Sequence, residues 1–246
     1  MSAASEYISG DSPKRASLVG SHELEAKSAK WVTLKEICWL DEDGRERRWE
    51  AAERKTRGSA GIDAVAIIAI LRPTETGEAL HTVIIEQYRP PVGSYVVEAP
   101  AGRHSAPSSL ESLITPSFHG PGLIDEDEDV EQAGIRELEE ETGLKASGVI
   151  YTSPLQVCDP GMTTANMKLI VVDVPVRSVK DALPDQKLEA SEHIVRRIVP
   201  LETLNEELKA YAERGFSVDA RLSHFAIGWE LANKLRQIPM QTGRGQ

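Results

Sequence analysis

The chain has 246 residues, of which 40% are hydrophobic and 27% are charged, and its formal net charge is -11. This is the composition of a soluble globular protein of one or two domains. It contains no apolar segment near the ~20 residues that span a bilayer, and its acidity argues against nucleic-acid binding, which requires a basic patch. The N-terminus lacks the apolar segment of a signal peptide. We therefore expect a cytoplasmic protein, with the nucleus as an open alternative.

Two segments near the N-terminus predict a β-hairpin. Residues 1–25 are rich in Ser, Ala and charge, and we expect them to form a disordered tail. Residues 31–40 are rich in β-forming side chains, an Asp-Gly step follows, and residues 45–54 return as a second strand. Because a lone hairpin is only marginally stable, the segment 26–60 is expected to pack on its own domain or on a partner subunit.

The rest of the chain predicts one layered domain. Residues 63–71 are nearly all apolar, which is typical of a strand buried on both faces. Further strands are expected at 82–88, 94–98, 148–152, 168–174 and 194–199. Helices are expected at 201–214 and 218–235, the second with Ser217 as its N-cap. These elements predict an α/β fold, an α/β/α sandwich with a mixed sheet over residues 61–238, followed by a flexible tail at 239–246.

Residues 103–121 interrupt this pattern. They contain five Ser and three Pro among 19 residues, which marks an irregular loop. A loop of this length within a domain is either a lid or a disordered insertion, and we favour the insertion.

The densest charge lies in residues 122–144, where ten of 23 residues are Asp or Glu and one is Arg. The apolar residues repeat with helical spacing at Val130, Ala133, Gly134 and Leu138. This spacing places Glu137, Glu140 and Glu141 together on another face, with Arg136 in reach of Glu140. Like charges so arranged destabilise a helix by roughly 0.2–0.5 kcal/mol per pair. The segment is therefore either a solvated acidic face or a site for a hard cation such as Mg²⁺ or Mn²⁺.

The complete spacing of this segment favours a cation site over a solvated acidic face. Gly122, Glu128 and residues 136–144 fit the pattern G-x5-E-x7-R-E-U-x-E-E-x-G-U, where U is aliphatic. The chain therefore resembles the Nudix hydrolases, a family that cleaves nucleoside diphosphates linked to another moiety. Gly143 is also expected to end the helix as its C-cap.

The resemblance implies a metal site built on this helix. Glu137 and Glu141 are implied as ligands of Mg²⁺, with Mn²⁺ as a substitute, and Glu140 as a further ligand or partner that acts with Arg136 in catalysis. A backbone carbonyl before the box is implied to complete the ligand set. Ala101 is favoured because it continues a strand, and Pro121 is the alternative.

Features outside the box are similar to the ADP-sugar (ADP-ribose) pyrophosphatase branch. These features are the segments Glu-Gln-Tyr-Arg-Pro-Pro at 86–91 and Glu-Ala-Pro-Ala-Gly at 98–102, Pro160 at 16 residues beyond the box, and a hairpin with two tryptophans. In that branch such a hairpin is exchanged across a homodimer, and the tryptophans sandwich the adenine.

The resemblance implies contacts to the substrate from seven residues. They are Trp31 and Trp49 for adenine, Arg54 and Arg89 for phosphate, and Asp63, Glu98 and Pro160 near them. The plainer alternatives are core aromatics for the tryptophans, surface charges for the arginines, and strand-end caps for Asp63 and Glu98. For Arg57, phosphate contact and surface charge both remain open. The catalytic base is implied to come from a later loop, as Glu192, with Glu189 as the runner-up.

The sequence thus predicts an enzyme that hydrolyses the pyrophosphate of ADP-ribose, and of other ADP-sugars, to AMP and the sugar phosphate. Its expected partners are a nucleotide-sugar and a second copy of the chain, without nucleic acid or membrane. The alternatives are a Nudix hydrolase of another nucleoside diphosphate derivative, such as an oxidised one, and a module that binds ADP-ribose without catalysis.

Overall fold

A computed structural model describes residues 26–55, 57, 61–75, 77–103, 129–181, 183–190 and 192–238. The expected tails at 1–25 and 239–246 lie outside the described residues. So does the insertion from residue 104 onward, together with Gly122, Glu128 and the alternative ligand Pro121.

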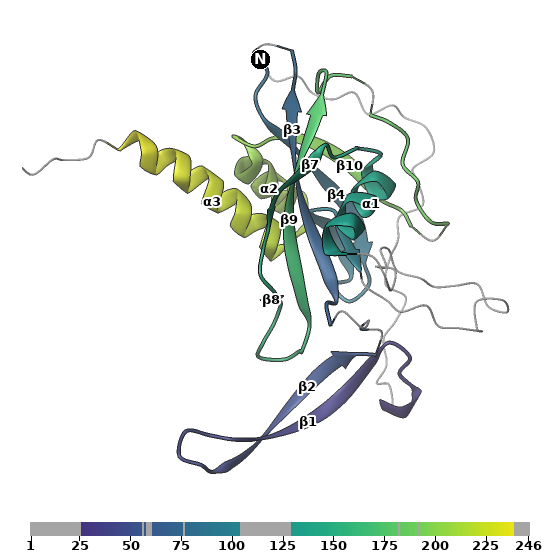
Figure 1. Ribbon diagram of the computed structural model, residues 1–246, viewed down its shortest axis with the longest axis vertical. Helices are drawn as coiled ribbons and strands as arrows, with labels where there is room; N and C mark the ends of the chain where they lie inside the picture. Colours follow the sequence, from purple (N-terminus) through teal and green to yellow (C-terminus); the bar gives the residue numbers. More distant parts are fainter. Residues whose placement is uncertain are drawn as a thin grey trace, which may run out of the picture.

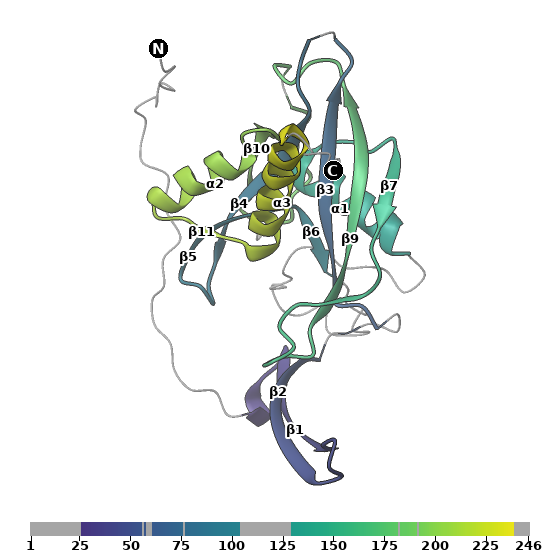
Figure 2. The ribbon, with the colours of Figure 1, turned by 90° about the vertical axis from the view of Figure 1, so that its left-hand side faces the viewer.

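The N-terminal hairpin is confirmed. After a short 3₁₀ helix, η1 (Ala26–Ser28), strand β1 (Val32–Leu40) pairs antiparallel with β2 (Glu46–Arg54). In the turn between them, Asp41 accepts hydrogen bonds from the backbone of Asp43 and Arg45, and Gly44 adopts a φ of 74°. Figures 1 and 2 show the hairpin extending away from the main body of the protein. Its two strands form a sheet that is separate from the main sheet.

The main sheet is mixed. Its strands are β3 (Ala64–Pro73), β4 (His81–Arg89), β5 (Ser94–Glu98), β6 (Ala101–Arg103), β7 (Gly148–Thr152), β8 (Gln156–Val157), β9 (Asn166–Val176), β10 (Val195–Pro200) and β11 (Ser217–Val218). Their order is β11-β5-β4-β3-β9-β7, with β10 on β4, β6 on β3 and β8 on β9. The pairs β3·β9 and β11·β5 are parallel, and the other pairs are antiparallel.

Helices cover both faces of this sheet. Helix α1 (Val130–Thr142) packs through Leu138 on Val65 and Ile67 of β3. Helices α2 (Leu204–Glu213) and α3 (Ala220–Gln237) pack on the other face. Ile68 of β3 belongs to the hydrophobic core on that face. Figure 1 shows α2 and α3 on one side of the strands and α1 on the other. The predicted α/β/α sandwich and the doubly buried strand at 63–71 are thus confirmed.

The predicted start of the last helix is wrong. Ser217 and Val218 form β11, and the Ser217 hydroxyl is 2.8 Å from the hydroxyl of Ser94. The N-cap is Asp219, whose carboxylate accepts the N–H groups of Arg221 and Leu222. Asp and Ser serve equally well as N-caps, so the pairing of β11 with β5 decides the position.

No helix in the described part of the chain has the length and apolarity needed to cross a membrane.

Candidate active site

Helix α1 presents its glutamates at a fixed position because both of its ends are capped. At the N-terminus Asp129 accepts the N–H groups of Glu131 and Gln132, and the Gln132 side chain accepts the N–H of Asp129. At the C-terminus Gly143 has a left-handed φ of 74°, and its N–H donates to Glu139 O at 2.7 Å. The expected glycine C-cap is confirmed.

The three expected metal-site glutamates differ in burial. Glu137 and Glu141 are each only 2% exposed, whereas Glu140 is half-buried. Arg136 joins two of them, because its Nη1 lies 2.9 Å from both Glu137 Oε1 and Glu140 Oε2. A solvated acidic face therefore does not describe Glu137 and Glu141.

Strand β6 lies directly against this buried pair. The Ala101 N–H donates to Glu141 Oε2 at 3.2 Å. A Cβ added at Gly102 would lie 2.5 Å from Glu137 Cγ, so only glycine leaves room for that side chain. Ala101, whose backbone carbonyl is the favoured further metal ligand, thus lies next to both glutamates. Gly102 is a site residue that sequence reasoning passed over, although it follows Ala101 directly.

The electrostatics of the buried pair favour a cation. Burial raises the pKa of Glu137 to about 8, although Arg136 acts to lower it. Burial also raises the pKa of Glu141 well above its ordinary range, and the neighbouring charge of Glu137 adds to this effect. Of the two buried carboxylates, only Glu137 is paired with an arginine, so the pair is short of positive charge, which a divalent cation supplies.

These residues fit a magnesium ion as a partial ligand set. Within the described ranges, no three His, Cys, Asp or Glu side chains gather into a complete metal-binding group. Mg²⁺ does not require one, because it binds proteins through one or two carboxylates and keeps water and substrate oxygens as its other ligands. Glu137 and Glu141 supply that number of carboxylates.

The loop between residues 183 and 195 carries both base candidates. Glu192 is half-buried and Glu189 is exposed. Burial raises the pKa of Glu192, and the charges of Glu189 and Glu140 add to this effect. The charge of Glu192 in turn contributes to the raised pKa values of Glu137 and Glu141. Glu192 is therefore close enough to the buried pair to affect its protonation. Its carboxylate accepts the Glu189 N–H at 2.9 Å.

Arg89 and Glu98 form an ion pair next to this group. Arg89 Nε donates to Glu98 Oε1 at 2.8 Å, and Glu98 is buried at the end of β5. The charge of Glu98 contributes to the raised pKa of Glu141. On the same face of β4 as Arg89 lies the buried Gln87, whose Oε1 has no hydrogen-bond partner among the described residues. Gln87, like Gly102, is a residue near the site that sequence reasoning did not single out.

The hairpin joins the domain at the loop that contains Pro160. Trp49 Nε1 donates to Gly161 O at 3.0 Å, and the backbone of Ala52 exchanges hydrogen bonds with Met162 and Thr164. Trp31 is 55% exposed and Trp49 is 51% exposed. They are therefore not core aromatics.

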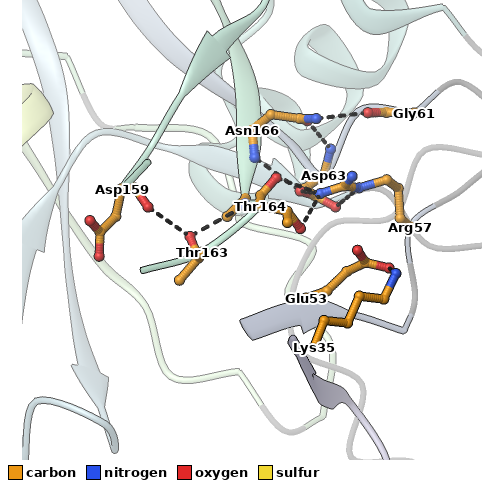
Figure 3. A network of polar contacts seen from close by, with 10 residues as sticks. Lys35, Glu53, Arg57, Gly61, Asp63, Asp159, Thr163, Thr164 and Asn166 are labelled. Carbon is orange, nitrogen blue, oxygen red and sulfur yellow. Dashed lines mark hydrogen bonds and ion pairs between the residues drawn. The ribbon is translucent and has the colours of Figure 1, made fainter. Parts of the chain in front are cut away.

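Beside this junction, Asp63 is the centre of a polar network (Figure 3). Its two oxygens accept Arg57 Nε and Nη2 at 2.8 and 2.7 Å, and Asp63 Oδ2 also accepts the Asn166 N–H. Arg57 continues to Thr164 O at 2.6 Å. Burial acts to raise the Asp63 pKa, but Arg57 and the Asn166 N–H hold it below its ordinary range. Asp63 and Arg57 thus anchor the base of the hairpin, while Arg54 is exposed at the end of β2.

A cavity of about 380 Å³ opens between β3, β9 and the start of α3. Its lining includes the small side chains of Ala66, Ala99 and Ala101, and the polar group of Arg221. Asp219 holds that guanidinium, with Arg221 Nη2 at 2.6 Å from Asp219 Oδ2. The cavity lies with Ile68 on the face of the sheet that α2 and α3 cover, whereas Glu137 lies with Val65 on the face that α1 covers.

Residues 62–220 match the model of the NUDIX domain. The chain therefore belongs to the Nudix family, as the spacing of its acidic helix predicts. It is 40% identical over 205 residues to a Schizosaccharomyces pombe protein described as an uncharacterized Nudix hydrolase, covering 83% of this chain and 88% of that protein.

Two further relatives carry more specific names. The chain is 32% identical over 223 residues to the ADP-ribose pyrophosphatase of Saccharomyces cerevisiae, covering 90% of this chain and 87% of that protein. It is 31% identical over 217 residues to the ADP-sugar pyrophosphatase of Mus musculus, covering 88% of each. The crystal structure of an ADP compounds hydrolase shares the fold, with a TM-score of 0.51 at 18% identity over 92% of this chain and all of that one.

Proposed function

We propose that the protein hydrolyses ADP-ribose, and related ADP-sugars, in the presence of Mg²⁺. Water adds across the pyrophosphate: its oxygen forms a new P–O bond, the bridging P–O bond breaks, and AMP and ribose 5-phosphate are released from ADP-ribose. The observation that carries the proposal is the buried pair Glu137 and Glu141 beside Ala101. The names of the yeast and mouse relatives support the choice of substrate.

The proposed roles follow from the positions of the side chains. Glu137 and Glu141 hold the cation, with the Ala101 carbonyl as a further ligand. When bound, the cation neutralises charge on the pyrophosphate oxygens and lowers the pKa of a water molecule. Arg136 keeps Glu137 and Glu140 in place through its two hydrogen bonds.

The proton of the attacking water goes to Glu192. A carboxylate whose pKa is raised by burial is a stronger base than an exposed one, which suits general base catalysis near neutral pH. Glu189 is exposed, whereas Glu192 is half-buried and its charge raises the pKa of both Glu137 and Glu141. These observations support Glu192 over Glu189.

Arg89 and Arg54 are proposed to contact the phosphates, since a planar guanidinium suits paired phosphate oxygens. The hydrogen bond from Arg89 Nε to Glu98 Oε1 holds the guanidinium group by its Nε edge. Glu98 and Asp63 then act mainly by orienting arginines, and Pro160 shapes the loop that receives Trp49.

The register of the hairpin supports a dimer. Trp49 pairs with Ile37, and Trp31 lies six residues before Ile37, immediately ahead of β1, which places the two tryptophans about 20 Å apart at 3.3 Å per residue. The ring centroids of one stacked pair lie within about 7 Å of each other, so two residues that sandwich one adenine lie at most about 14 Å apart. Trp31 and Trp49 of one chain are too far apart for this. A sandwich of both residues needs a second copy of the chain. Light scattering tests this proposal: a dimeric mass is expected, and an active monomer would contradict it.

A panel of substrates tests the specificity. ADP-ribose, ADP-glucose, GDP-mannose and an oxidised nucleoside diphosphate are incubated with enzyme and Mg²⁺, and the nucleotides are separated. We expect the highest kcat/KM with ADP-ribose. Equal turnover of GDP-mannose would retain the class of reaction and reject the preference for ADP. Tight ADP-ribose binding without any turnover would indicate a binding module.

A further inference from the structure

The metal-bearing end of α1 is closed by the loop that carries the proposed base. The last four carbonyl groups of a helix have no partner within it. Here Gly143 N–H donates to Glu139 O at 2.7 Å, and Lys187 N–H donates to Glu140 O at 2.8 Å. The remaining carbonyls accept side chains: Gln186 Nε2 lies 2.6 Å from Glu141 O, and Arg196 Nη1 donates to Thr142 O. Segment 186–196 thus supplies three of these four donors.

Gln186 has a second partner that makes it a bridge. Its Nε2 also lies 3.2 Å from Ile194 O. Ile194 is buried and directly precedes β10, and it stands two residues after Glu192. One amide group therefore ties together the end of the metal-bearing helix, the start of the base loop and the end of that loop.

Close packing leaves this loop little freedom at its entrance. A Cβ added at Gly143 would lie 2.6 Å from the carbonyl oxygens of both Pro184 and Asp185. The helix end and the loop backbone are therefore in direct contact. By comparison, the ion pair of Lys187 Nζ with Glu139 at 2.7 Å is largely exposed, and exposed pairs contribute little to stability.

We propose that Gln186 is a positioning residue, which fixes Glu192 relative to Glu137 and Glu141 by joining the carbonyl groups of Glu141 and Ile194. The inference rests on the proposed function, because the position of Glu192 matters only if Glu192 is the base. Loss of the bridge leaves substrate contacts in place and lets the base move. Misplacement of a catalytic group by about 1 Å can lower the rate by about 100-fold.

The first test compares three variants with wild type on ADP-ribose. Gln186→Met keeps the length of the side chain and removes both donated hydrogen bonds. We expect its kcat to fall about 10- to 100-fold, with KM within about twofold of wild type. Gln186→Lys restores a donor at similar reach and is expected to recover most of the kcat. Lys187→Met is the matched control in the same loop, and we expect its kcat to stay within about twofold.

A double-mutant cycle separates positioning from general destabilisation. In a Glu192→Gln background the base is already absent, so adding Gln186→Met should leave kcat unchanged. If Gln186 only supported the fold, the two losses would multiply. That result, or a Gln186→Met single variant with wild-type kcat, would overturn the inference. Wild-type protein that releases no AMP would instead reject the proposed function itself.

Discussion

Replacing Glu137 with Gln tests the buried pair most sharply, because it removes one charge and preserves the size of the side chain. Burial raises the Glu137 pKa from its ordinary 4.5 to about 8. The folded protein then binds this proton more tightly than the unfolded chain does. The stability that the proton contributes is full below about pH 4.5 and is lost as the pH rises through about 8.

The size of the effect follows from that interval. At about 1.36 kcal/mol per pKa unit, a rise from 4.5 to about 8 sets an upper bound of roughly 5 kcal/mol on the stability lost by metal-free wild type. The variant cannot ionise at residue 137, and its amide oxygen can still accept the hydrogen bond from Arg136. We therefore expect metal-free Glu137→Gln to be more stable than wild type at pH 8, by part of this amount, and the difference to shrink near pH 5.

Urea unfolding followed by tryptophan fluorescence measures this difference, with EDTA present at both pH values. Added Mg²⁺ should stabilise wild type more than the variant at pH 8, because a ligand that binds only the folded state raises stability by mass action. The variant should also lose hydrolytic activity by orders of magnitude. A variant less stable than wild type at pH 8 without metal would show that Glu137 carries no such electrostatic penalty.

Three further substitutions probe the same site. Glu141→Gln should lower turnover by orders of magnitude, while calorimetry should still detect ADP-ribose binding. Unchanged turnover would show that Glu141 is not a metal ligand. Glu192→Gln should lower kcat by about 10²- to 10⁴-fold, the range for loss of a general base, and a normal kcat would transfer that role elsewhere. Gly102→Ala should lower activity more than Gly148→Ala, because the added Cβ meets Glu137 Cγ at 2.5 Å in the first case and open space in the second; equal activities would contradict the close packing of β6 on α1.

The elements with a clear period could be predicted from the sequence. The strands predicted at 63–71 and 82–88 agree with β3 and β4 to within two residues at each end, and the acidic helix ends at Gly143 as its sequence indicates. Strands β6, β8 and β11 have only two or three residues each. Such short segments show no period, since their pairing depends on neighbours far along the chain.

The candidate metal site could be proposed from the sequence because its residues are close together in the chain, whereas the residues that support it could not. Glu137 and Glu141 share one helix, and their spacing is visible in the sequence. Gln186 reaches Glu141 O from 45 residues away, and only the fold brings the two together. Asp63 was expected near the substrate, but both of its oxygens are bonded to Arg57 and Asn166, which supports an anchoring role.

Product analysis with ADP-ribose tests whether the protein is a metal-dependent pyrophosphatase. Wild-type protein is incubated with ADP-ribose and Mg²⁺, with EDTA, and with EDTA followed by excess Mg²⁺, and the nucleotides are separated. We predict equal amounts of AMP and ribose 5-phosphate with Mg²⁺, none with EDTA, and recovery when Mg²⁺ is restored. No AMP at micromolar enzyme, or AMP formation that is unaffected by EDTA, would contradict this prediction.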